Sequence, residues 1–136
     1  MILRNLWRGL FVALFILVTW LTLTPNTDDT RDSLAIARFI AELLFRNPSL
    51  SDKVAHFLAY ASLGGSAAFA HFRLFDRRAP MIVALALYGA FLEFLQGLGG
   101  VRDAELADAL ANSMGALAAF PTAIAIETWA VRLRPQ

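Results

Sequence analysis

Four apolar segments account for most of the chain, at about residues 6–23, 54–72, 80–98 and 106–131. Each is close to the ~20 residues that a helix needs to cross the ~30 Å hydrocarbon core of a bilayer. With 58% hydrophobic residues, 17% charged residues and a mean hydropathy of +0.58, the chain is too apolar for an ordinary soluble domain. The sequence therefore predicts an all-α polytopic membrane protein, a four-transmembrane-helix bundle in a single domain over residues 1–136.

The first apolar segment has two interpretations. Arg4 and Arg8 stand at its start, so it can be a membrane helix or a cleaved signal peptide. The apolar run is long and ends in Thr-Leu-Thr-Pro, without the small-x-small pattern of a cleavage site. We therefore expect an uncleaved membrane helix.

A shorter segment, at about residues 31–46, has a different pattern. Large apolar residues recur in it at helical spacing, namely Leu34, Ile36, Phe39, Ile40, Leu43 and Leu44, and charged residues fill most of the opposite side. Such a helix beside a membrane span is typical of one that lies in the interface plane. The sequence predicts this extra amphipathic interfacial helix, while a soluble cap packed on the loops stays open as an alternative.

Arginines gather at one set of segment ends, which consists of Arg4, Arg8, Arg73, Arg77, Arg78, Arg132 and Arg134. By the positive-inside rule this side faces the cytoplasm, so the predicted topology is N-in/C-in. Because these cations are spread over several ends and the net charge is only +1, nucleic acid is not an expected partner. The chain has no cysteine, which excludes thiolate nucleophiles and Cys-based metal sites.

In this topology three polar stripes reach the outer face of the membrane. They are Asp52, His56 and Tyr60 in the second span, Glu93 and Gln96 in the third, and Asp108, Asn112 and Gly115 in the fourth. Members of each stripe are three or four residues apart and therefore share one helix face. At ~1.5 Å per residue, His56, Glu93 and Asn112 all fall within roughly 10 Å of the outer helix ends. The sequence thus predicts one polar pocket below the outer surface.

The residue types in this pocket suit acid–base chemistry on an anion. Helix N-termini in spans two and four favour negative charge, and Lys53 and Arg102 add formal positive charge. His56 can carry a proton near neutral pH, and Glu93 is a candidate acid or base. A set of Asp, Glu and His can also hold a divalent cation, although no spacing specific for a metal is present.

Each residue also has a structural interpretation. Ser51 or Asp52 can cap a helix, and Lys53 can reach the head groups by snorkelling. Gln96 and Asn112 can join helices by hydrogen bonds. Glu93 can form a buried ion pair with Arg102 or Lys53.

The set Asp52-Lys53-x-x-His56-x-x-x-Tyr60, Glu93-x-x-Gln96, Arg102 and Asp108-x-x-x-Asn112-x-x-Gly115 resembles the VanZ-like family of small bacterial membrane proteins, named for teicoplanin (glycopeptide) resistance. Two positions depart from the family pattern: Val101 stands where Pro often precedes the Arg, and Ala119 where a further Gly is common. The resemblance implies an integral protein of the bacterial cytoplasmic membrane that acts at the cell envelope. It also implies similarity to membrane enzymes that exchange or hydrolyse phosphate-bearing lipid head groups.

The leading hypothesis is a membrane protein whose outward-facing pocket binds, and transfers or hydrolyses, such a head group, with a polyprenyl phosphate or a phospholipid as the lipid partner. The catalytic candidates are His56, Glu93, Asp108 and Asp52, and the substrate-binding candidates are Lys53, Tyr60, Gln96, Arg102 and Asn112. The alternatives are a non-catalytic lipid- or antibiotic-binding protein and a structural subunit or small transporter. The sequence leaves open the lipid, the use of a metal and the oligomeric state.

Overall fold

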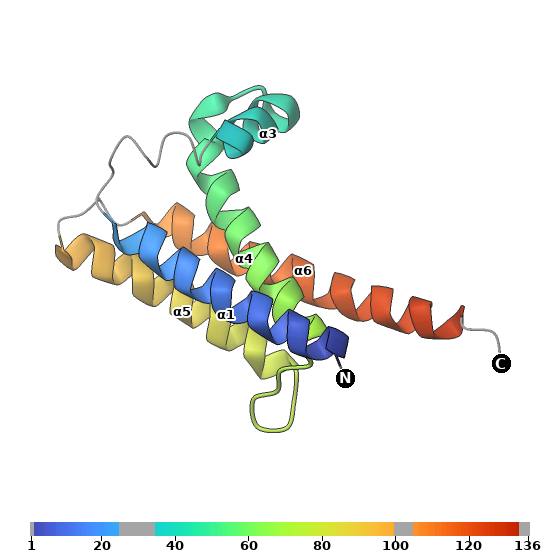
Figure 1. The fold of residues 1–136 in the computed structure, drawn as a ribbon. Helices are drawn as coiled ribbons and strands as arrows, with labels where there is room; N and C mark the ends of the chain where they lie inside the picture. The colour runs from blue at the N-terminus through green and yellow to red at the C-terminus, as the bar shows by residue number, and fades with distance from the viewer. Residues whose placement is uncertain (1, 25–34, 100–104, 134–136) are drawn as a thin grey trace.

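The computed structural model describes residues 2–24, 35–99 and 105–133. In chain order its helices are α1 (Ile2–Leu23), α3 (Ala35–Phe45), the 3-10 turn η1 (Pro48–Leu50), α4 (Ser51–Phe69), α5 (Ala79–Gly99) and α6 (Leu106–Arg132), as Figure 1 shows. Within these described ranges, the only β pairing is an isolated bridge between Leu74 and Arg77. The predicted all-α class is therefore confirmed for this part of the chain.

Three helices are long and apolar enough to cross a membrane, namely α1, α5 and α6. Large apolar side chains stay exposed along all three, for example Ile16 on α1, Leu87 on α5 and Leu117 on α6. Exposed apolar surface on this scale is unusual for a soluble monomer and suits contact with lipid. These helices have the character of a membrane protein.

The fourth predicted span corresponds to α4, a helix of 19 residues that is not one of these three candidate spans. Its first turn carries Asp52 and Lys53, and small residues such as Gly64 and Ser66 fill its interior. α4 packs against α1, α3, α5 and α6, and it crosses between α1 and α6 in Figure 1. A helix enclosed by other helices meets little lipid. Small side chains that permit close helix packing then matter more than apolar ones.

The closest helix contact joins α4 and α6. A Cβ added to Gly115 would lie 2.2 Å from the carbonyl oxygen of Phe57, and one added to Gly64 would lie 3.0 Å from the carbonyl oxygen of Ala116. Only glycine permits backbones to approach this closely. These contacts join the third turn of α6 to the middle of α4, and so fix how closely the two helices cross.

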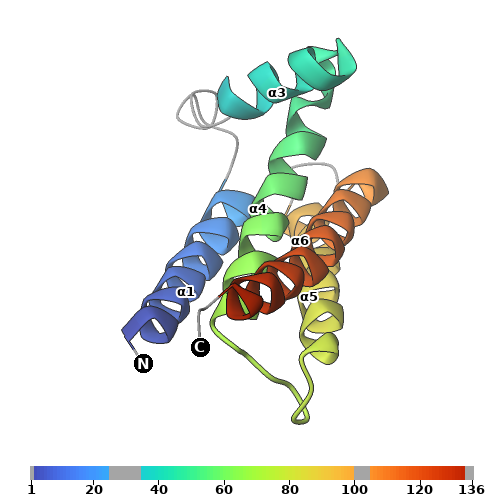
Figure 2. The same cartoon turned by 90° about the vertical axis from the view of Figure 1, so that its right-hand side faces the viewer.

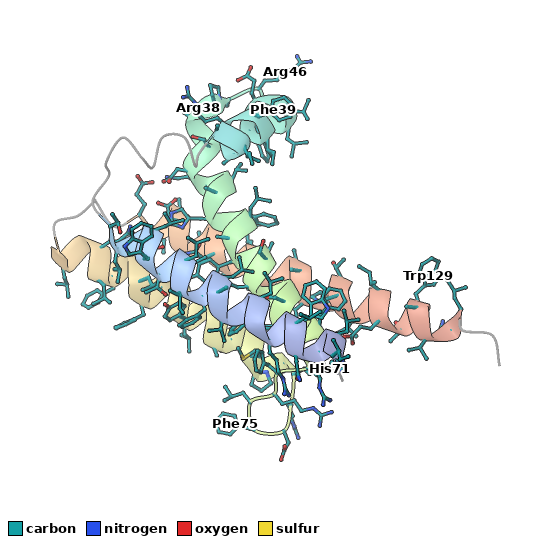
Figure 3. All side chains as sticks on the ribbon, in the orientation of Figure 1. Arg38, Phe39, Arg46, His71, Phe75 and Trp129 are labelled. Atoms are coloured by element: carbon teal, nitrogen blue, oxygen red, sulfur yellow. The ribbon has the colours of Figure 1, made fainter. Side chains whose placement is uncertain are left out.

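The amphipathic segment forms α3, which lies across the start of α4 (Figure 2). Its residues Ala37 and Ala41, with the partly buried Ile40, pack in one cluster with Val54. Most of its large residues face away, and Phe39 is 67% exposed and visible at the edge of the molecule in Figure 3. Residues 31–34 of the predicted helix lie outside the described residues. The helix is thus attached through alanines and presents its large apolar side chains outward.

The predicted helix cap of α4 is wrong. The helix begins at Ser51 with Leu50 at the N-cap position, and no side chain caps it. The polar cap stands one turn earlier, where the Asn47 side chain accepts a hydrogen bond from the Ser49 backbone at 3.1 Å. Because η1 runs directly into α4, the side chain of Asp52 stays available to contact other groups.

Candidate functional site

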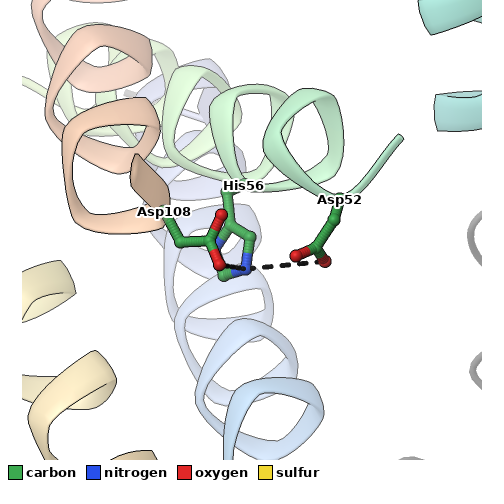
Figure 4. A group of neighbouring side chains, drawn as sticks. All are labelled: Asp52, His56 and Asp108. Atoms are coloured by element: carbon green, nitrogen blue, oxygen red, sulfur yellow. Dashed lines mark ion pairs between the residues drawn. The ribbon is translucent and has the colours of Figure 1, made fainter. Parts of the chain in front are cut away.

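His56 lies at the centre of a polar cluster to which three helices contribute. From α4, Asp52 Oδ1 is 3.9 Å from His56 Nε2; from α6, Asp108 Oδ2 lies at the same distance from that nitrogen. On the other side of the ring, Nδ1 is 3.0 Å from Asn112 Oδ1 of α6 and 3.5 Å from Glu93 Oε1 of α5. Figure 4 shows Asp52, His56 and Asp108 in this arrangement. We call Asp52, Lys53, His56, Glu93, Glu105, Asp108 and Asn112 the outer cluster.

The hydrogen bond to Asn112 defines the histidine tautomer. An amide oxygen can only accept a hydrogen bond, so Nδ1 of His56 must carry the proton that it shares with Asn112 Oδ1. In the neutral ring, Nε2 then carries the lone pair. That lone pair is on the side of the ring that faces Asp52 and Asp108.

Lys53 lies at the start of α4 and forms ion pairs with three carboxylates. Its ammonium lies 3.1 Å from Asp108 Oδ1 and 3.7 Å from Asp52 Oδ2, and it donates a hydrogen bond to Glu105. Partial burial lowers the pKa of this ammonium, but attraction to Glu105, Asp108 and Asp52 outweighs burial and raises the pKa above its ordinary value. The three carboxylates therefore favour the charged form of Lys53.

The cluster is both buried and acidic. Glu93 is 4% exposed, Asp108 2% and Asn112 1%. Four carboxylates, those of Asp52, Glu93, Glu105 and Asp108, lie around Lys53 and His56. Among the described residues, these four acids outnumber Lys53, which contacts three of them, when His56 is neutral. Burial of unbalanced charge is costly, so this arrangement favours a bound cation or proton.

Tight packing beneath the cluster holds Asn112 in place. A Cβ on Gly89 would lie 2.9 Å from Asn112 Cβ and 3.0 Å from the Tyr60 ring, so only glycine fits at this position of α5. Tyr60 is almost completely buried, and its hydroxyl has no hydrogen-bond partner among the described residues. Tyr60 thus closes the apolar side of the cluster.

Three predicted site residues are not members of the outer cluster, and one of them, Tyr60, packs beneath it. The amide of Gln96 donates a hydrogen bond to the backbone carbonyl of Thr22 on α1, which is the helix-joining role. Arg102 lies outside the described residues. Glu105, which pairs with Lys53, was not predicted; it is the N-cap residue of α6 in extended conformation, so helical spacing gave no signal for it.

A second polar group lies at the opposite end of the molecule from α3, where Figure 3 places His71. Glu127 Oε2 accepts a hydrogen bond from Arg78 Nη1 at 3.0 Å, and Glu127 Oε1 lies 3.2 Å from His71 Nε2. Arg78 also donates to His71 Nδ1. We call these three residues the inner cluster; its acid and its arginine form a matched pair.

A comparison with protein families finds that residues 11–127 match the family model described as VanZ/LLP1. The matched region contains every member of the outer cluster. No curated protein and no solved structure matches the chain.

Proposed function

Because the chain belongs to the VanZ/LLP1 family, we propose that it acts on the phosphate-bearing head group of an envelope lipid. In this proposal the outer cluster binds the head group and catalyses its transfer or hydrolysis. The protein is a multi-pass component of the bacterial cytoplasmic membrane, and its site opens toward the outer leaflet.

The proposed topology has four spans, with α4 crossing beside α1, α5 and α6. The start of α1, the α4–α5 connection and the end of α6 carry the arginines, and these parts lie at one end of the molecule (Figures 1 and 2). The positive-inside rule assigns this end to the cytoplasm. The outer cluster and α3 then lie at the outer surface, where the exposed large side chains of α3 enter the lipid interface.

One observation carries the proposal: three helices bring His56, Glu93, Asp108 and Asn112 into contact at a buried position. Ionisable groups buried between membrane helices are costly and mark functional sites. A purely structural bundle would pack apolar or small residues there. The adjoining helices expose apolar side chains, so a lipid tail can remain in the bilayer while its head group reaches the cluster.

The chemistry needs an anion site and a proton path. The first turns of α4 and α6 carry members of the cluster, so the positive ends of the two helix dipoles favour phosphate there, as does Lys53. In the reaction, the oxygen of water or of an acceptor alcohol bonds to phosphorus and loses its proton to a base. The bond from phosphorus to the leaving oxygen breaks, and that oxygen takes a proton from an acid. Glu93, 3.5 Å from His56, is the candidate for this acid–base work.

The test uses the purified protein in nanodiscs with radiolabelled polyprenyl phosphate or phosphatidyl lipids. We expect Glu93→Gln to lower head-group release or exchange by about 100-fold, in line with the loss of a general acid or base. The matched control is Glu127→Gln, which removes a carboxylate from the other end of the bundle and should retain wild-type turnover. His56→Asn and His71→Asn form a second pair, because His71 adopts a left-handed φ of 57° that Asn tolerates.

Equal activity in Glu93→Gln and the wild type would contradict the enzymatic part of the proposal. If the wild type and Glu93→Gln then both bind lipid, and Lys53→Ala or Arg102→Ala does not, the result would indicate a non-catalytic lipid-binding protein. Failure of the wild type to bind any phosphate-bearing lipid would contradict the proposal as a whole and favour a structural subunit.

A further inference from the structure

We propose that Asp52, His56 and Asp108 form a binding site for a divalent metal ion. One ligand atom from each, two carboxylate oxygens and a ring nitrogen, lie within 4.8 Å of one another. Asp52 and His56 stand one turn apart on α4, and Asp108 comes from the first turn of α6 (Figure 4). The α4–α6 crossing therefore builds the site from two elements that the glycine contacts hold together.

The tautomer of His56 is the first reason for this assignment. Its Nδ1 proton is donated to Asn112 Oδ1, which leaves the Nε2 lone pair on the side of two carboxylates. A lone pair repels carboxylate oxygens, and at 3.9 Å neither oxygen is within hydrogen-bonding distance. A cation among the three atoms converts this repulsion into coordination. Metal-bound histidines commonly donate their other ring N–H to an oxygen in this way, which makes Asn112 the orienting partner.

The environment of Asp108 is the second reason. The residue is 2% exposed, and among the described residues its Oδ1 pairs with the ammonium of Lys53, at 3.1 Å. Lys53 is shared with Asp52 and Glu105, so it does not balance Asp108 alone. A buried carboxylate of this kind requires further positive charge. Coordination of Asp108 through Oδ2, the atom that faces His56, supplies it.

The donor set indicates the class of ion. One imidazole and two carboxylates suit first-row divalent ions such as Mn²⁺ and Zn²⁺. Ligand atoms at about 2.1 Å from an octahedral ion are about 3 Å apart, so a small rotation of the two Asp side chains would close the present 3.9 Å gaps. Three protein ligands leave coordination positions open, as in catalytic metal sites.

An open coordination position on the ion would also explain how so acidic a cluster can bind an anion. A phosphate would be repelled by the four carboxylates, whereas a cation held by Asp52 and Asp108 would attract a phosphate oxygen. This role of the ion rests on the proposed function; the binding of the ion itself does not. Glu93 is not one of the three ligands and remains the group for proton transfer.

The experiment measures binding of Mn²⁺ to chelator-treated protein in nanodiscs made of neutral lipid, by electron paramagnetic resonance, with Zn²⁺ as competitor. We expect one saturable site in the wild type and in His71→Asn. Asp108→Asn and His56→Asn should weaken binding by about 100-fold or more, and Asn112→Ala, which removes only the orienting partner, by about 10-fold. If Asp108→Asn fails to fold, Asp52→Asn replaces it, because Asp52 is less buried than Asp108.

Absence of saturable binding of both ions, or equal affinity in the wild type and in the Asp52, His56 and Asp108 variants, would overturn the metal site. Retention of phosphate-bearing lipid in the nanodiscs is then measured with and without Mn²⁺. Metal binding without lipid retention leaves the site intact and contradicts the proposed function. Lipid retention without metal binding contradicts the metal site and leaves the proposed function intact.

Discussion

The two polar clusters of this protein use similar residues in opposite ways. Each contains a histidine and a carboxylate, but the inner cluster balances Glu127 of α6 with Arg78 of the α4–α5 connection and is partly exposed to solvent. In the outer cluster, carboxylates outnumber the cations, and Glu93 and Asp108 are buried. The partly exposed ion pair between Arg78 and Glu127 is sufficient to explain the inner cluster without a ligand. The outer residues need something more, and this difference is the basis for proposing a ligand at that end alone.

The backbone contact under the outer cluster should give the largest effect. Gly115→Ala would place a Cβ 2.2 Å from the Phe57 carbonyl oxygen and force α6 away from α4. We expect the free energy of unfolding to fall by about 3 kcal/mol, measured by thermal or SDS denaturation in mixed micelles, together with loss of Mn²⁺ binding. Gly65→Ala is the control, since its Cβ would meet only Ala119 at 4.0 Å and should change stability little. Equal stability of the two variants would show that the crossing is looser than described.

Neutralising one carboxylate in each cluster should change stability in opposite directions. With chelator present, Asp108→Asn should raise the free energy of unfolding by about 1 kcal/mol, because Lys53 keeps two other carboxylate partners while a buried charge is removed. Glu127→Gln should lower it by up to about 1 kcal/mol through loss of the Arg78 pair. Saturating Mn²⁺ should stabilise the wild type but not Asp108→Asn. Destabilisation by both substitutions under chelation would mean that the outer charges are already balanced.

The smallest expected effect is the difference in stability between removing the hydroxyl of Tyr88 and removing that of Tyr60. Tyr88 shares a hydrogen bond with Thr19 of α1, so Tyr88→Phe should cost about 1 kcal/mol of stability. The Tyr60 hydroxyl has no described partner, so Tyr60→Phe should leave stability unchanged or slightly raised. Denaturation of both variants in the same micelles measures this contrast. If Tyr60→Phe is stable but binds lipid more weakly, the hydroxyl belongs to the ligand site; a loss of stability equal to that of Tyr88→Phe would contradict the assignment.

Periodicity and helix polarity were enough to predict much of the outer cluster. Residues spaced by four on α4 and α6 must share a face, which is why Asp52 with His56 and Asp108 with Asn112 were grouped correctly. The same reasoning failed for Gln96, because its partner is a backbone carbonyl on α1 and no spacing along α5 indicates it. It also missed the η1 turn that replaces a side-chain cap on α4.

The sequence by itself determined which segments form helices and which polar side chains share a face, because hydropathy and a period of 3.6 residues are local properties of the chain. Only the tertiary structure decided that Asn112 orients His56 and that Lys53 is divided among three acids. Those contacts depend on the depth to which α6 packs against α4 at Gly64 and Gly115. That depth is set by the fit of two backbones, a property that no single segment contains.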